Sequence, residues 1–196
     1  MAKNNLIRLC LLWFALSIPV YTVADNDGYC VRATAASFVG VMEKGGNNQA
    51  FNDRELQKMM AAVGWKPGYA WCAFFVRAIL DECGIENSIS GWSPTSYNRK
   101  DVIFTDGRFY QSFKDGDVLV MAMSYSKFKN TGRNKAIGHT GIVDRISKHS
   151  VRTIEGNTNE QGMRDSRSRD GVYIKIRPLS KNIHITRWKR STRFRM

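Results

Sequence analysis

Histidine and cysteine are scarce in this sequence, and their scarcity narrows the kinds of reactive site that it can carry. The 196 residues include only three histidines and four cysteines. A histidine general base must therefore be His139, His149 or His184. The chain also lacks internal repeats and low-complexity segments, and its length fits one domain that buries a sizeable core.

The sequence also lacks an apolar run long enough to span a membrane as a helix. The run at residues 9–20 falls short of the roughly 20 residues that a spanning helix needs. Lys3 and Arg8 precede the run and the small residue Ala24 follows it, which is typical of a secretory signal peptide. An amphipathic first helix is the alternative. We expect residues 1–24 to be a signal peptide and residues 25–196 to form one exported domain, in the periplasm or outside the cell.

Acidic residues are few relative to basic ones. There are 17 Asp and Glu against 30 Lys and Arg, which gives a formal net charge of +13 at pH 7. Such a surface favours polyanions, namely nucleic acid, anionic lipid headgroups or a bacterial cell wall. Export makes nucleic acid the poorest fit, and beyond the basic tail at residues 187–196 we find no aromatic-basic motif. The sequence therefore predicts no nucleic-acid partner.

Three cysteines remain after removal of the signal peptide: Cys30, Cys72 and Cys83. An odd number in an oxidising compartment implies one thiol outside any disulfide. Cys72 and Cys83 would lie on one helix, about 16 Å apart along its axis, which is too far for a disulfide. Any disulfide must therefore join Cys30 to Cys83 or Cys30 to Cys72.

Hydrophobic periodicity predicts helices in the first half of the chain and strands in the second. Helices are expected at residues 30–42, at 54–64 after the N-cap Asp53, and at 71–83, where the almost continuous apolar pattern predicts burial all round. After a polar loop, strands are expected at residues 115–123, 138–146, 151–157, 171–179 and 183–188. This order predicts an α+β fold, with an antiparallel sheet of about five strands packed on the third helix.

Four residues have the chemical types that a site built on a cysteine nucleophile requires. Cys72 stands in the first turn of the third helix, where backbone N–H groups and the helix dipole favour a thiolate. His139 opens a strand, whereas His149 lies in a turn and His184 in a late strand. Glu155 and Asn157 are two residues apart on an extended segment, so both are expected to face His139. Each residue also has a structural interpretation, since an unpaired cysteine commonly packs in a core.

Several stretches resemble the successive motifs of one enzyme family. "GYAWCAFFV", "GDVLVM", "GHTGIV" and "EGNTN" are similar to those of CHAP-type cysteine, histidine-dependent amidohydrolases/peptidases, which are papain-like cell-wall hydrolases of bacteria and phages. The resemblance extends over residues 43–188, and "EGNTN…DGVYIKIRP" is most similar to versions from Bacteroidetes and their phages. It implies that Cys72 is the nucleophile, His139 the general base, Glu155 its orienting partner and Asn157 a fourth polar member near the cysteine.

The resemblance further implies a substrate and a reaction. The implied substrate is peptidoglycan, an amide bond of whose stem or crossbridge peptide would be cleaved through a cysteine thioester. We expect the protein to be a monomer. Trp71, Trp92 and Tyr97 are candidates for the substrate groove, although ordinary aromatic packing accounts for each one equally well.

The sequence leaves two alternative functions open and predicts that no metal is bound. The domain could be a catalytically silent wall-binding module, or a transpeptidase or acyltransferase that uses the same Cys–His pair. Some relatives bind calcium through an aspartate-rich loop before the cysteine, but "GGNNQAFNDRELQ" offers no convincing ligand cluster. We therefore expect no metal and no other cofactor.

Overall fold

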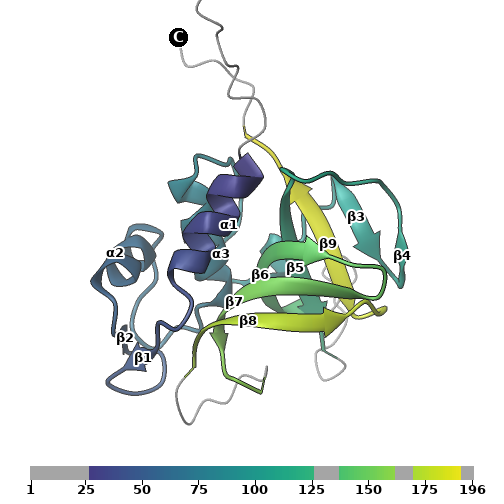
Figure 1. Ribbon diagram of the computed structural model, residues 1–196. Helices are drawn as coiled ribbons and strands as arrows, with labels where there is room; N and C mark the ends of the chain where they lie inside the picture. Colours follow the sequence, from purple (N-terminus) through teal and green to yellow (C-terminus); the bar gives the residue numbers. More distant parts are fainter. Residues whose placement is uncertain (1–26, 126–136, 162–169, 191–196) are drawn as a thin grey trace, which may run out of the picture.

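The computed structural model describes residues 27–125, 137–161 and 170–190. The predicted signal peptide, residues 1–24, lies outside the described residues, as does the end of the basic tail. A helical part stands on one side of the molecule and a strongly twisted antiparallel sheet on the other (Figure 1). The predicted α+β class is therefore confirmed.

Three α-helices form the helical part: α1 (Asp27–Ser37), α2 (Arg54–Ala62) and α3 (Cys72–Glu82). The Asp53 side chain caps α2 by accepting a hydrogen bond of 2.8 Å from the backbone N–H of Leu56, as the sequence predicts. The first helix ends five residues earlier than predicted, before Gly40, whose φ of 90° does not fit a right-handed helix.

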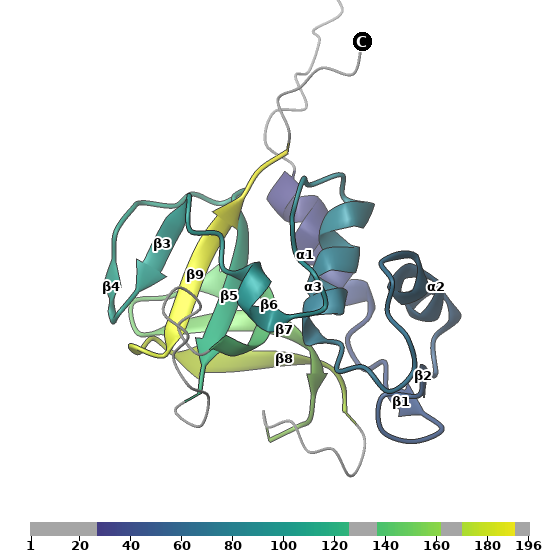
Figure 2. The same cartoon turned by 180° about the vertical axis from the view of Figure 1, so that it is seen from behind.

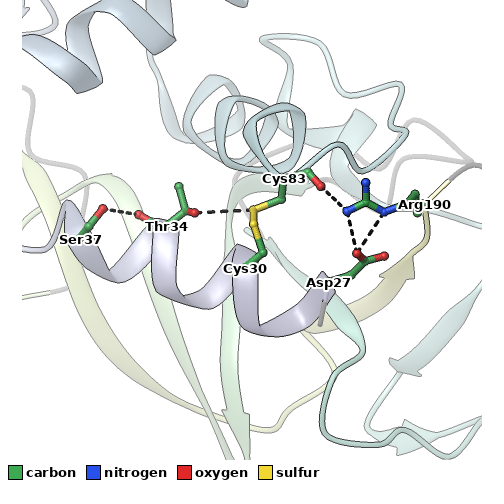
Figure 3. The surroundings of a disulfide bond; sticks show 6 residues. All are labelled: Asp27, Cys30, Thr34, Ser37, Cys83 and Arg190. Carbon is green, nitrogen blue, oxygen red and sulfur yellow. Dashed lines mark hydrogen bonds and ion pairs between the residues drawn. A yellow bond between two sulfur atoms is a disulfide. The ribbon is translucent and has the colours of Figure 1, made fainter. Parts of the chain in front are cut away.

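A disulfide between Cys30 and Cys83 joins α1 to the residue that follows α3, with a Cα–Cα distance of 5.9 Å. Figure 3 shows this connection, together with Arg190, which contacts both the Cys83 carbonyl oxygen and the Asp27 carboxylate. Of the two pairings that the sequence leaves open, Cys30 with Cys83 is therefore the one that forms. Cys72 stays outside any disulfide, so its thiol is retained for other chemistry.

Among the described residues, the main sheet has seven strands rather than the expected five. They run in the order β4-β3-β9-β5-β6-β7-β8 with every neighbouring pair antiparallel. Their bounds are β3 (Val102–Thr105), β4 (Arg108–Phe109), β5 (Val118–Ser124), β6 (Ile137–Ile146), β7 (Ser150–Thr158), β8 (Gly171–Pro178) and β9 (Ile183–Trp188). The two unexpected strands, β3 and β4, are short, and β3 pairs with β9 near the other end of the chain, so local periodicity did not reveal them.

Two smaller elements lie outside the main sheet. Strands β1 (Glu43–Lys44) and β2 (Ala50–Phe51) form a two-stranded ribbon close to α2. A 3-10 helix, η1 (Ser93–Ser96), packs against α3, β5 and β6. It lies within the segment expected to be a polar loop, and it brings that segment against the start of α3.

Helix α3 lies beside α1, and both helices pack against the sheet (Figure 2). Helix α3 packs on β6 and β7 and buries eight of its eleven residues, which confirms the predicted burial. Gly156 on β7 permits this approach, because a Cβ there would lie only 2.5 Å from the Trp71 ring. No helix in the described parts of the chain is long and apolar enough to cross a membrane.

Candidate active site

Cys72 is the first residue of α3, and its side chain is buried, with 2% of the residue exposed. The segment "KPGYAW" leads into the helix through a turn in which Gly68 has a φ of 91°, a value that favours glycine. The helix therefore begins at the cysteine, where the positive end of the helix dipole stabilises a thiolate.

The start of α3 is held by Asn157, which comes from β7. The Asn157 side-chain oxygen accepts a hydrogen bond of 2.9 Å from the backbone N–H of Trp71, the residue before Cys72. Its side-chain nitrogen donates to Asn48 at 3.1 Å and to Asp170 at 3.3 Å. Asn157 thus joins three segments of the chain around the residue that precedes Cys72.

From the sequence we expected Asn157 to face His139, but its side-chain hydrogen bonds go to other residues. The expectation assumed an extended backbone, in which residues two apart point the same way. Asn157 instead has a φ of 57°, in the left-handed region, and the pairing of β7 with β8 changes register between Glu155 and Thr158. The side chains of Glu155 and Asn157 therefore make separate sets of contacts.

His139 lies on β6 with 2% of the residue exposed. Its ring nitrogen Nε2 is 2.9 Å from Oε2 of Glu155. The other nitrogen, Nδ1, is buried and has no hydrogen-bond partner within the described segments. The Cys72 side chain lies close enough to affect the ionisation of the ring. One side of the imidazole is thus oriented by a carboxylate, and the cysteine lies near the ring.

Glu155 is fully buried and receives four hydrogen bonds. Thr153 donates to Oε1 at 2.5 Å and His139 contacts Oε2. Arg177, on the neighbouring strand β8, donates to both oxygens, at 3.0 Å and 2.6 Å. A bidentate pairing of this kind restricts a carboxylate in both position and orientation.

Gly141 makes room for the contact between Glu155 and His139. A Cβ on Gly141 would lie 2.6 Å from Cγ of Glu155. The Glu155 side chain therefore lies against a position on β6 where no side chain is tolerated, two residues beyond His139. This gives the second glycine of "GHTG" a specific steric role.

The charges of His139 and Glu155 stabilise each other. Burial opposes a charged imidazole, but the side chains of Cys72 and Glu155 outweigh it and raise the pKa of His139 to about 9. Burial likewise opposes a charged carboxylate, yet His139 and then Arg177 lower the pKa of Glu155 to about 2. At neutral pH His139 is therefore an imidazolium beside the Glu155 carboxylate, so it can donate a proton as a general acid.

Three contributors to this cluster were not expected from the sequence. Thr153 and Arg177 hold Glu155, and the Ser93 hydroxyl oxygen lies 3.3 Å from the sulfur of Cys72. Alternation along β7 could have indicated Thr153, since it precedes Glu155 by two residues. No local signal identifies Arg177 or Ser93, because each reaches the site through the tertiary fold.

The three aromatic candidates for a substrate groove differ in exposure. Trp71 is completely buried, and its ring nitrogen donates to Glu43 at 2.7 Å, so it cannot line an open groove. Trp92 is 57% exposed beside Ser93 and retains that candidacy. Tyr97 is half-buried and places its ring edge-on to His184. Tyr69, which is 52% exposed and stacks on Phe74, is a further candidate that the sequence did not suggest.

The other two histidines have different surroundings. His149 is exposed in the turn between β6 and β7. His184 is buried between two hydroxyl groups, Thr105 at 2.8 Å from Nδ1 and Ser124 at 2.7 Å from Nε2. Neither contact supplies a carboxylate.

No group of three or more histidine, cysteine, aspartate or glutamate side chains in the described part of the chain is arranged to hold a metal ion. The contacts at Cys72, His139 and Glu155 are instead made with one another and with serine, threonine and arginine side chains. The arrangement suits covalent acyl transfer by a thiolate, with the histidine as acid and base.

Comparison with known proteins yields one match. No curated protein and no solved structure matches the chain. The helix that begins at Cys72 packs against an antiparallel sheet, as expected for a papain-like fold. Residues 64–157, slightly less than half of the chain, match the family model of the CHAP domain, and this segment contains Cys72, His139 and Glu155.

Proposed function

We propose that this protein is a cysteine-dependent peptidoglycan hydrolase that cleaves an amide bond of the cell-wall peptide. The observation that carries the proposal is geometric: Nε2 of the buried His139 lies 2.9 Å from the Glu155 carboxylate, which Arg177 holds, and Cys72 lies near the ring at the start of α3. A match to the CHAP domain supports the same chemistry. In this proposal Cys72 is the nucleophile, His139 the acid and base, and Glu155 the residue that orients His139.

In the first half of the reaction, the Cys72 thiolate attacks the carbonyl carbon of the amide. The backbone N–H of Cys72 precedes the hydrogen-bond ladder of α3 and is assigned as a donor to the developing oxyanion. His139, as the imidazolium, then protonates the leaving nitrogen as the carbon–nitrogen bond breaks. The products of this half are a free amine and a thioester on Cys72.

In the second half, neutral His139 accepts a proton from water as the water oxygen attacks the thioester carbonyl. Collapse of the tetrahedral intermediate breaks the carbon–sulfur bond and releases a carboxylic acid. The thiolate of Cys72 and the imidazolium of His139 are thereby restored. Glu155 holds the ring in one tautomer and stabilises its charge throughout, as the third member of such a triad does generally.

The substrate assignment rests on the CHAP match and on charge. Stem peptides carry free carboxylates, and a net charge of +13 favours a polyanionic wall. We assign Trp92 to the rim of the substrate groove and Asn157 to holding the start of α3. The proposal includes export after removal of residues 1–24, a single monomeric domain at residues 25–196, and, from "EGNTN…DGVYIKIRP", kinship with versions from Bacteroidetes and their phages.

The test is digestion of purified peptidoglycan by the wild-type protein and by Cys72→Ala, followed by mass spectrometry of the soluble fragments. We expect new amino and carboxyl termini with the wild-type protein only. Fragments joined by new amide bonds would identify a transpeptidase. Binding to the wall without new termini in either sample would identify a silent wall-binding module.

A further inference from the structure

Ser93 lies beside the sulfur of Cys72 although the two residues are far apart in sequence. Its hydroxyl oxygen is 3.3 Å from that sulfur, and both residues are buried. Ser93 is the first residue of η1, and η1 packs against α3 and β6, the two elements that carry Cys72 and His139. The hydroxyl thus belongs to a third element that meets the nucleophile.

The Ser93 hydroxyl has one hydrogen-bond partner within the described residues, the sulfur of Cys72. A buried hydroxyl group needs a hydrogen-bond partner, because leaving it unsatisfied costs free energy. A thiolate has no proton to donate, so in the ionised state the hydroxyl must be the donor and the sulfur the acceptor. This hydrogen bond is therefore stronger with the thiolate than with the thiol.

The turn that carries Ser93 is held firmly in place. The Ser96 hydroxyl donates to the Ser93 carbonyl oxygen at 2.7 Å, and Thr95 donates to the Trp92 carbonyl oxygen at 2.7 Å. A Cβ on Gly91 would lie 2.2 Å from the ring of Phe74, so the turn lies directly on α3. The position of the hydroxyl is therefore set before any substrate binds.

We infer that Ser93 is a further catalytic residue, which donates a hydrogen bond to the Cys72 thiolate and keeps the cysteine ionised and oriented. The inference rests on the proposed function, since it assigns Ser93 to the same nucleophile. A hydrogen bond to the charged form of a group favours that form. Removal of the hydroxyl therefore raises the pKa of the Cys72 thiol.

The test measures the ionisation of Cys72 directly and requires no substrate. The rate of alkylation by iodoacetamide is followed against pH, because the thiolate is the reactive form. Cys30 and Cys83 are protected by their disulfide. Modification of Cys72 is quantified by mass spectrometry of its peptide, which separates it from Cys10 in the full chain.

Two matched pairs of variants isolate the hydroxyl. Ser93→Ala removes it, while Ser88→Ala removes an exposed hydroxyl from the loop before the turn. Ser93→Thr and Ser93→Val have nearly the same shape and differ in the hydroxyl. We expect Ser93→Ala and Ser93→Val to raise the pH midpoint of alkylation by about one unit, equivalent to about tenfold slower alkylation below the midpoint. Ser93→Thr and Ser88→Ala should keep the wild-type midpoint.

The outcomes separate this inference from the proposed function. A wild-type midpoint near the ordinary thiol value of about 8.5 would overturn the proposed function, because Cys72 would then not be activated. A low wild-type midpoint that neither Ser93→Ala nor Ser93→Val changes would overturn the role of Ser93 alone. If Ser93→Ala does not fold, as judged by near-ultraviolet circular dichroism, the threonine and valine variants decide the question.

Discussion

His139 and His184 are both about 2% exposed and both lie on central strands of the same sheet, yet their hydrogen-bond partners differ. His139 has a carboxylate on one ring nitrogen, and its other nitrogen has no hydrogen-bond partner within the described residues. His184 has a hydroxyl group on each nitrogen, from Thr105 and Ser124.

This difference bears on which of the two histidines is suited to proton transfer. Burial is equal at the two positions, so burial does not explain it. A carboxylate stabilises an imidazolium through charge, which a hydroxyl group cannot do. A nitrogen with no other partner can also exchange a proton with a nucleophile or leaving group, whereas both nitrogens of His184 are already engaged. The surroundings of His139 therefore support proton transfer, and those of His184 support the packing of β3, β5 and β9.

The largest expected effect is on turnover, at His139. His139→Ala should reduce peptidoglycan hydrolysis by about 10³-fold or more, the scale of general acid–base catalysis. Adding Cys72→Ala to it should cause little further loss, because residues that act as a unit are non-additive. Turnover is measured by the release of new amino termini. If His184→Ala is inactive and His139→Ala is active, the assignment of proton transfer to His139 is wrong.

The next effect concerns the carboxylate that distinguishes the two histidines. Glu155→Gln should lower turnover by more than about tenfold, since a charge that stabilises the imidazolium is lost. The pKa of His139 should fall from about 9, so the alkaline limb of the pH–rate profile should move to lower pH.

Arg177→Gln is the matched control for that change, because it keeps the carboxylate and removes its bidentate partner. It should lower turnover less than Glu155→Gln, and the alkaline limb should not move to lower pH. If Arg177→Gln shifts the limb downward and Glu155→Gln does not, Glu155 is not the group that sets the charge of His139.

A third prediction concerns stability at His184. His184→Ala should lower the free energy of unfolding by about 3 kcal/mol, because it leaves a cavity and two hydroxyl groups without their ring partner. Urea denaturation measures the loss, and the folded variant should keep its turnover. The exposed His149→Ala should change stability by less than about 0.5 kcal/mol.

The smallest expected effect on the chemistry is at Asn157, which contacts the backbone before Cys72 and not the histidine. Asn157→Ala should lower the free energy of unfolding by about 2 kcal/mol, since the buried N–H of Trp71 loses its acceptor. Asn157→Gly, which tolerates the positive φ, separates this loss from backbone strain and should be the milder change. Turnover should fall a few-fold in both variants. If the alkaline limb of the pH–rate profile moves to lower pH in either variant, Asn157 does act on His139.

Much of the fold could be predicted because its signals are local. Asp53 marks the start of α2. The Pro-Gly turn and Gly84 predicted both ends of α3 to within one residue. Alternating and continuous apolar runs located β5 to β9 within a few residues. Strands β3 and β4 were missed because four- and two-residue strands have almost no periodicity, and they are defined by pairing with β9 rather than by their own pattern.

The site divides in the same way. Sequence order and residue type singled out Cys72, His139 and Glu155, and the structure brings these three together. The contacts of Asn157 could not be predicted, because a single left-handed residue changes the direction of a side chain and leaves no mark in the alternation. Arg177 reaches Glu155 from the edge strand β8, where an arginine is common simply because its charge remains in contact with water.

The sequence by itself determined the fold class, the buried helix that begins at Cys72, and the chemical types that surround a cysteine nucleophile. The fold class and the helix follow from hydrophobic period and helix signals, which are properties of short segments. The choice of histidine was narrowed by the composition, which contains only three. Only the tertiary structure decided that Cys30 pairs with Cys83, that Arg177 holds Glu155, and that Ser93 meets the sulfur of Cys72. Each of these depends on distances between segments that helix packing and strand pairing bring together, and no local pattern encodes such distances.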